Sequence, residues 1–368
     1  MDYEIDFLAV GEGERSGDAI ALRYGNLRGP REQQFVMVID GGTLDSGQAL
    51  VDHISHIYGT NHVDLVVSGH PDADHASGLS VVLEKMTVGR LWMHQPWKHA
   101  KEIMDMFENE RITHTGLKTT FQEALEHARE LEMIAAKKRI QIQEPFSDVN
   151  MGYSHISVLG PSTDFYESLL PRFREVPEPK QGLARIAEAL YGGVGVITEK
   201  AKQVMESWGL ETLEEPGDGS TSAENDSSTI LLLQIDGKGI LFTGDAGISA
   251  LNLAAGHAES LGISLPESLE FCQVPHHGSR RNVGPGILDR ILGLRKSSEI
   301  YPKTAFVSSA KDSDKHPSKR VVNAFKRRGA QVYATQGKGL CHSSHGISRQ
   351  GWSGATPLPF YAKVEEEN

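Results

Sequence analysis

The chain has 368 residues, of which 39% are hydrophobic and 23% are charged, a composition typical of a globular protein that folds in water. Its formal net charge of −12 excludes a surface that attracts nucleic acid everywhere, so a polyanionic substrate would need a local basic patch. The two cysteines, Cys272 and Cys341, predict no disulfide framework. Because no apolar run has transmembrane length and the sequence opens on acidic residues, we expect no membrane contact and a cytoplasmic location.

The first part of the chain predicts strands over 3–10, 17–22 and 35–39, the last of which ends in Asp40-Gly41-Gly42. An Asp-Gly-Gly sequence is either an ordinary turn or a polar group placed at a strand end. The apolar spacing over 45–58 then predicts an amphipathic helix, capped by Asp45 or Ser46. His53 lies on this helix and is expected to face solvent.

The most informative stretch lies between a β-branched apolar run at 63–67, predicted as a buried strand, and a predicted helix at 78–86. It places His70, Asp72, Asp74 and His75 within six residues. Imidazole and carboxylate groups are ligands of Zn²⁺, Mn²⁺ and Fe²⁺, and burying four of them requires a counter-charge. The stretch therefore predicts a metal-binding loop at the end of a strand, and the competing interpretation is a polar loop with a capping aspartate.

The rest of the chain alternates strands with helices, which predicts an α/β fold in one domain over 1–368. Largely helical stretches over about 96–145 and 164–224 are interpreted as insertions. Further strands are expected over 88–93, 155–159, 229–234, 239–243, 270–274, 303–309 and 331–334, and a basic helix over 319–328.

More polar groups follow these later strands. They are Asn225 and Asp226 before one strand, Asp245 after another, the pair His276-His277, and His316 before the basic helix. Side chains at the ends of several strands can converge on one site.

The spacing His70-x-Asp72-x-Asp74-His75 resembles the metal motif of the metallo-β-lactamase superfamily. Most members have histidine at the position of Asp72, and the aspartate form is similar to the hydrolase domain of ComEC-type DNA-uptake proteins and their stand-alone relatives. Thr243-Gly244-Asp245 and the segment 275–279, Pro-His-His-Gly-Ser, resemble further motifs of that group in the same order. The resemblance implies a four-layer αββα sandwich, here with two helical insertions, and a hydrolase that uses two divalent metal ions, Zn or Mn.

The resemblance also implies roles for individual residues. Asp245 would bridge both metals, and the site of His70 and Asp72 would lack its usual third histidine, with Asn225 or Asp226 in its place. The full set of implied metal ligands is His70, Asp72, Asp74, His75, Asp226, Asp245 and His277. The candidate catalytic residues are Asp74, His276 and His316.

The resemblance favours a phosphodiesterase or nuclease, with a phosphodiester as substrate and nucleic acid as one candidate. Two alternatives remain: a hydrolase of the same fold acting on a cyclic nucleotide, an ester or a lactam, and a non-catalytic module that binds a partner. A nuclease would need a basic rim beside the metals. The candidates for this rim are Arg280, Arg281, Lys311, Lys315, Lys319 and Arg320.

Overall fold

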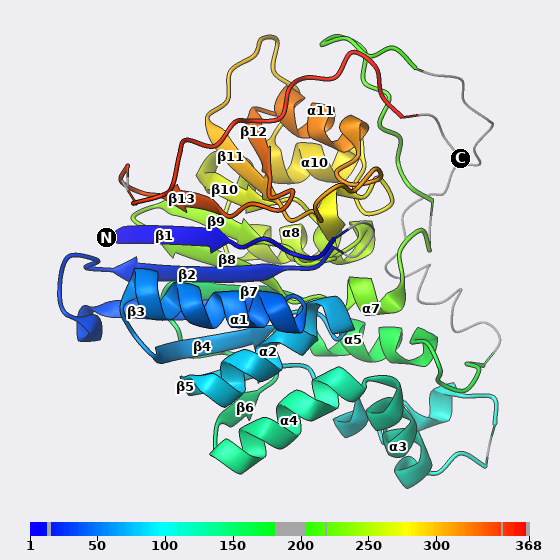
Figure 1. Cartoon of the computed structure of the whole chain (residues 1–368). Coiled ribbons are helices and arrows are strands. Elements are labelled where there is room, and N and C mark those ends of the chain that lie inside the picture. Colours follow the sequence, from blue (N-terminus) through cyan, green and yellow to red (C-terminus); the bar gives the residue numbers. More distant parts are fainter. Residues whose placement is uncertain (13–15, 110, 181–203, 218, 347–348, 366–368) are drawn as a thin grey trace.

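The computed structural model describes the chain except residues 13–15, 110, 181–203, 218, 347–348 and 366–368 (Figure 1). Its described part contains two mixed β-sheets. The first sheet has the strand order β13 (Leu340–Ser343), β1 (Asp2–Phe7), β2 (Ala19–Gly25), β3 (Gln34–Gly41), β4 (His62–Ser68), β5 (Thr87–Met93) and β6 (Gln141–Gln143). The second has the order β12 (Ala330–Ala334), β11 (Lys303–Val307), β10 (Leu269–Gln273), β9 (Lys238–Phe242), β8 (Ile230–Ile235) and β7 (Ile156–Gly160).

Each sheet joins an antiparallel half to a parallel half. In the first sheet β13, β1, β2 and β3 pair antiparallel, and β3, β4, β5 and β6 pair parallel. In the second, β7, β8 and β9 are antiparallel and β9 to β12 are parallel. Parallel strands have their C-terminal ends at the same edge of a sheet. The loops after β3 and β4 therefore lie at one edge of the first sheet, and the loops after β9 and β10 lie at one edge of the second.

The helices include all of the predicted helical segments and three more, between residues 248 and 292, that no sequence pattern predicted. They are α1 (Leu44–His53), α2 (Ala73–Lys85), α3 (His114–Ala124), α4 (Glu126–Lys138), α5 (Thr163–Leu169), α7 (Ala223–Asp226), α8 (Ile248–Ser260), α9 (Leu265–Ser268), α10 (Pro285–Leu292) and α11 (Lys319–Arg327). Short 3₁₀ turns lie at Arg31–Gln33, Pro96–Lys98, Met104–Met106, Leu170–Arg172 and His276–Gly278, and Ile54–Tyr58 is a π turn.

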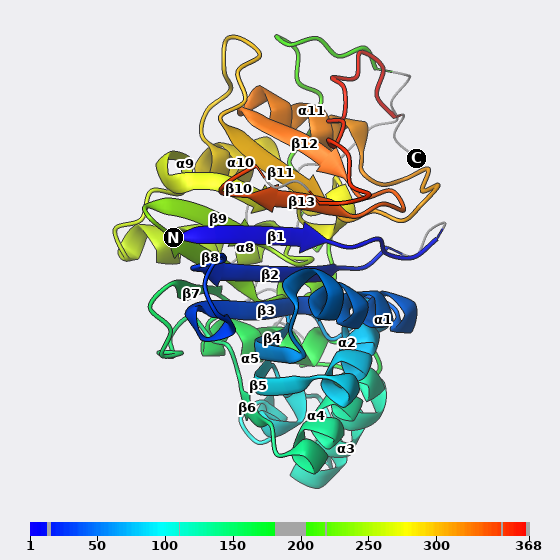
Figure 2. The ribbon, with the colours of Figure 1, turned by 60° about the vertical axis from the view of Figure 1, so that its left-hand side comes forward.

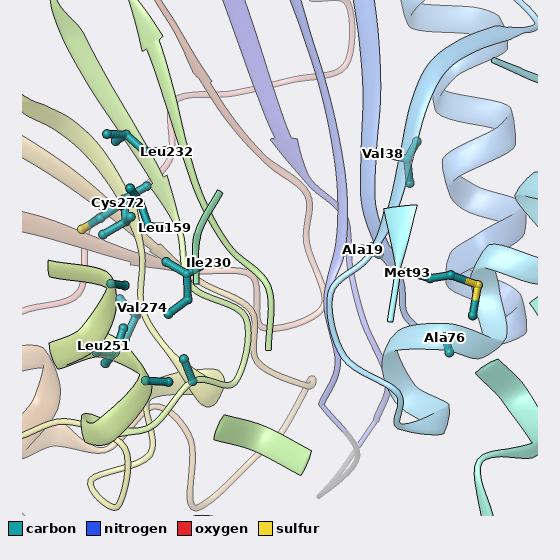
Figure 3. Packing of buried hydrophobic residues seen from close by; sticks show 14 of the residues in the cluster. Ala19, Val38, Ala76, Met93, Leu159, Ile230, Leu232, Leu251, Cys272 and Val274 are labelled. Carbon is teal, nitrogen blue, oxygen red and sulfur yellow. The ribbon is translucent and has the colours of Figure 1, made fainter. Parts of the chain in front are cut away.

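The alternation of side chains along the strands builds the layers. One set of apolar residues, including Phe7, Trp92 and Phe271, fills the space between the two sheets. The opposite strand faces are covered by helices: α1 and α2 on β2 and β3, α8 on β7, and α11 on β12. Figures 1 and 2 show these helices on the outer sides of the sheets. Figure 3 shows two groups of apolar side chains between helices and sheets, one around Leu232 and Leu251 and one around Val38 and Ala76. The predicted four-layer αββα sandwich is confirmed.

The first predicted helix differs in detail from α1. Thr43, rather than Asp45 or Ser46, is the N-cap, and its hydroxyl accepts a hydrogen bond from the Ser46 amide at 3.4 Å. The expectation that His53 faces solvent is wrong, because its side chain is buried and its Nε2 lies 3.1 Å from an Asp6 carboxylate oxygen. A charged partner from β1, distant in sequence, makes this burial possible.

Helix α2 begins at Ala73, earlier than the predicted start at residue 78, and it crosses very close to the end of β3. A Cβ atom placed on Gly78 would lie 1.9 Å from the Gly41 carbonyl oxygen, so this crossing requires glycine. The close approach fixes the first turn of α2, which carries Asp74 and His75, against the loop after β3.

The described parts of the two predicted insertions contact each other, since Phe107 and Pro179 form an isolated β-bridge. Residues 96–145 contain α3 and α4, and the part of 164–224 that is described contains α5, the turn at 170–172 and α7. Residues 181–203 of the second insertion lie outside the described residues. Among the residues that are described, we find no helix with the length and apolar character needed to cross a bilayer.

Candidate metal centre

Polar side chains from six segments converge where the strands of both sheets end. Asp40 ends β3, His70 follows β4, and Asp74 and His75 start α2. From the second sheet, Asp245 follows β9 and the His276-His277 pair follows β10. Asp18 joins them because β2 runs antiparallel to β3 and therefore begins at the same edge.

The carboxylate of Asp245 lies at the middle of this group. One oxygen is 3.3 Å from His75 Nε2 and 3.7 Å from both His70 Nε2 and His276 Nε2. Its other oxygen is 3.7 Å from His277 Nε2. Four imidazoles therefore surround one buried carboxylate.

Within this group, three sets of three residues have ligand atoms close enough together to hold one metal ion. Ligand atoms of Asp74, His75 and His277 all lie within 4.8 Å of one another, as do those of Asp245, His276 and His277. Asp18, His75 and Asp245 form a third such set. The implied ligands Asp74, His75, Asp245 and His277 are thus adjacent in the structure, together with Asp18.

Hydrogen bonds on the far side of the rings determine how two of the imidazoles face Asp245. His75 Nδ1 lies 2.9 Å from Asp40 Oδ2, and His277 Nδ1 lies 3.1 Å from the Ser308 carbonyl oxygen. Both partners are acceptors, so each Nδ1 carries the proton and, in a neutral ring, each Nε2 presents a lone pair to the centre. Asp40 is itself fixed, since its other oxygen accepts from the Gly69 amide at 2.7 Å.

His70 is held differently. Its Nδ1 accepts from the Asp72 amide at 3.3 Å, and its Nε2 lies 2.9 Å from Asn225 Oδ1. The structure thus brings Asn225, rather than Asp226, to His70. The Asp226 carboxylate instead accepts from the Gly247 amide at 3.1 Å, at the start of α8, and burial raises its pKa to about 6.

Asp72 lies at the margin of the group. One of its oxygens is 3.9 Å from His70 Nε2, and its carboxylate pairs with the guanidinium of Arg174. Asp72 is also in the N-cap position of α2, although its side chain makes no capping hydrogen bond there. Arg174 was not identified from the sequence, because no local pattern links residue 174 to the metal loop.

The candidate catalytic residues His276 and His316 lie on one side of Asp245. His276 Nδ1 is 2.7 Å from Asn282 Oδ1, and the rings of His276 and His316 are stacked with centroids 6.4 Å apart. His276 and His277 both have left-handed backbones, with φ of 44° and 56°. Such conformations are costly for residues with side chains, and they cluster at functional sites.

Burial and mutual charge determine protonation within the group. Burial lowers the pKa of His277 to about 3, and burial followed by the charge of His75 places the pKa of His70 well below its usual value. Burial acts against ionisation of His75 as well, but the carboxylates of Asp245 and Asp40 outweigh it and raise its pKa. Burial, reinforced by Asp245, raises the pKa of Asp18 to about 7.

The residues present fit divalent metal ions. Among the described residues, three buried atoms of this group, His75 Nε2, Asp245 Oδ1 and Asp18 Oδ1, have no hydrogen-bond partner. An unpaired buried polar atom is costly, and here imidazole nitrogens and carboxylate oxygens face one another. A cation between them removes both costs, and a set of imidazole nitrogens and carboxylate oxygens suits Zn²⁺ or Mn²⁺.

Two residues of the predicted basic rim have structural contacts. Arg320 is buried and donates to the Thr212 and Glu365 carbonyl oxygens, each at 3.2 Å. Lys319 Nζ lies 5.8 Å from the centre of the Tyr361 ring. These contacts attach α11 to the segments 204–213 and 358–365. The sequence patterns did not predict this packing.

Comparisons with known proteins give likenesses at low identity. No family model and no curated protein matches the sequence. Among solved structures, the chain is similar to a putative metallo-β-lactamase from Thermotoga maritima, with 10% identity, a TM-score of 0.34, and coverage of 71% of this chain and 93% of that one. It is also similar to a diphosphatase of the PhnP family (12% identity, TM-score 0.40, coverage 93% and 98%). A third is Tm1679, a metal-dependent hydrolase of the β-lactamase superfamily (14% identity, TM-score 0.44, coverage 92% and 98%). At these values the likeness assigns no residue role and no substrate.

Proposed function

We propose that this chain is a metal-dependent hydrolase whose substrate is a phosphodiester. One observation supports the proposal most: the Nε2 atoms of His75 and His277 face Asp245 in a buried group, with their Nδ1 protons bound to fixed acceptors. In proteins, a histidine that ligates a metal commonly donates its other N–H to a carboxylate or a carbonyl.

The proposed ligands divide into two adjacent sets. Asp74, His75 and His277 would hold one divalent ion, and His70 and Asp72 would contribute to the other, with Asp245 between them. We propose Asn225 as the remaining group beside His70, because its amide oxygen is 2.9 Å from the ring. Two divalent ions held there would supply an activated water and would stabilise negative charge developing on a phosphoryl oxygen.

The surrounding residues would orient this set and handle protons. Asp40 and the Ser308 carbonyl fix the rings of His75 and His277, while Asn282 fixes His276 at 2.7 Å. The His276 side chain is 30% exposed, and its Nε2 lies 3.7 Å from Asp245. We assign His276 and its neighbour His316 to substrate contact and protonation of the leaving group.

A small phosphodiester is favoured over a long polymer. Arg320 is buried in structural hydrogen bonds, so the predicted basic rim lacks one of its members. Long nucleic acids bind mainly through phosphate contacts along a basic surface, and the net charge of −12 opposes such binding elsewhere.

The test combines metal analysis with an activity screen on one preparation. Plasma emission should find divalent metal bound to the purified protein, and bis(4-nitrophenyl) phosphate or a dinucleotide should be cleaved. Single-stranded DNA, duplex DNA, RNA, cyclic nucleotides, esters and lactams complete the screen. His277→Ala should lose metal and activity, whereas His56→Ala, which changes an exposed histidine of the π turn, should keep both. Full activity in a metal-free, folded protein would refute the proposal.

A further inference from the structure

A pocket of about 310 Å³ adjoins the candidate metal centre. Asp72 and Asp74 line the pocket and also belong to the candidate metal centre. The pocket is lined by Pro71, Asp72, Ala73, Asp74, Ala124, Leu125, Glu126, His127 and Arg174. Its walls beyond the metal loop come from the junction of α3 and α4 and from the segment after Arg172. Both walls therefore belong to the two predicted insertions.

Arg174 is held firmly by its backbone and is accessible at its side chain. Its amide donates to the Glu224 carboxylate at 2.7 Å, and Glu224 is buried. The preceding residue, Phe173, is also buried, with its ring 6.4 Å from that of Phe121 in α3. The Arg174 side chain itself is 49% exposed. The anchored segment thus places the positively charged side chain of Arg174 at the pocket.

The present partner of Arg174 is a group that the proposed function assigns to a metal. The guanidinium pairs with the Asp72 carboxylate, with Nη1 3.5 Å from Oδ2. The Arg174 Nε also lies 3.9 Å from Glu224 Oε1. A divalent ion ligated by Asp72 would neutralise the Asp72 carboxylate and leave the exposed Nη atoms of Arg174 to contact another anion. The planar fork of arginine matches phosphate oxygens in a bidentate manner.

The other lining groups are apolar, imidazole and carboxylate side chains. Leu125, Ala124 and Pro71 provide apolar surface, and His127 is a second group able to donate to an anion. Glu126 also lines the pocket, but its side chain is 79% exposed and therefore well solvated.

We propose that this pocket binds a second anionic group of the substrate, with Arg174 as the residue that contacts it. The substrate class is then a short phosphodiester that carries a further phosphate next to the bond that is cleaved. The inference rests on the proposed function, since it extends the same site.

The first test compares two dinucleotides that differ by one terminal phosphate, TpT and pTpT. The wild-type protein should cleave pTpT with a kcat/KM about tenfold or more above that for TpT, because a charged hydrogen bond contributes about 1.5–3 kcal/mol. In Arg174→Gln this ratio should fall to about one, mainly through a higher KM for pTpT. The control Arg172→Gln changes an exposed arginine two residues away and should keep the wild-type ratio. Equal kcat/KM values in the wild type, or an unchanged ratio in R174Q, would overturn the inference.

A second test needs no turnover. Calorimetric titration of pyrophosphate into the Mn²⁺-loaded proteins should give a Kd about tenfold higher for R174Q than for the wild type and R172Q, with matching melting temperatures. Equal affinities, or no binding to the wild type, would contradict the role of Arg174. If the wild type cleaves neither dinucleotide, the proposed phosphodiesterase function fails, and the titration alone decides whether the pocket binds phosphate.

Discussion

Replacing Asp40 with asparagine tests whether the proton on His75 is positioned for metal binding. Asp40 accepts from the Gly69 amide with one oxygen, at 2.7 Å, and lies 2.9 Å from His75 Nδ1 with the other. If the asparagine oxygen keeps the Gly69 bond, its NH₂ group faces His75 Nδ1. Two donors cannot share that contact, so the neutral ring must move its proton to Nε2, the atom that faces Asp245.

The expected effect is on metal affinity rather than on folding. Losing the partner of a metal-ligating histidine typically weakens metal binding by about 10–100-fold, which corresponds to about 1.4–2.7 kcal/mol. The backbone should tolerate the change, because Asp40 has a φ of 54° and asparagine adopts this left-handed region readily.

The assay is a calorimetric titration of Zn²⁺ and Mn²⁺ into chelator-stripped protein, alongside a melting temperature. Asp45→Asn is the matched control, since it makes the same chemical change at an exposed carboxylate in the first turn of α1. A Kd for D40N within about threefold of the wild-type value, in a protein with an unchanged melting temperature, would refute the tautomer argument.

Three further predictions follow from the same geometry. Asp245→Ala should lower metal occupancy and reduce turnover by orders of magnitude without unfolding the protein, because two cations would lose the anion between them; metal content and turnover on one preparation check this. Asp72→Ala should release one metal before the other on dialysis against a chelator, and equal retention of both would count against its assignment. Although burial opposes ionisation of Asp6, contacts with His53 and Arg349 outweigh it and lower its pKa to about 2. A lowered pKa stabilises the fold above the unfolded value of about 3.9, so this contribution, about 2.6 kcal/mol, should be lost as pH falls from about 4 to 2. In urea titrations, Asp6→Asn should therefore be less stable than the wild type at pH 7, and the difference should shrink over that acid range.

Local patterns in the sequence determined the elements and most of the polar groups of the site. Strands such as β4 and β10 are short apolar runs followed at once by polar residues, and that contrast is visible without a structure. The close spacing of His70, Asp74 and His75 also belongs to one segment. Such signals are local, because hydrophobic periodicity and metal-ligand spacing act over a few residues.

The tertiary structure decided which distant groups meet. Asp18 precedes the antiparallel strand β2, Asn225 lies in a four-residue helix, and Arg174 follows a 3₁₀ turn, yet all three reach residues of the metal loop or its neighbours. Their positions depend on strand order and on how the insertions pack, and neither leaves a local pattern near Asp18 or Arg174. The exposure of a polar side chain is decided in the same way: His53 is buried because β1, far away in sequence, supplies Asp6, and Arg320 is buried because carbonyl oxygens from two other segments accept its hydrogen bonds.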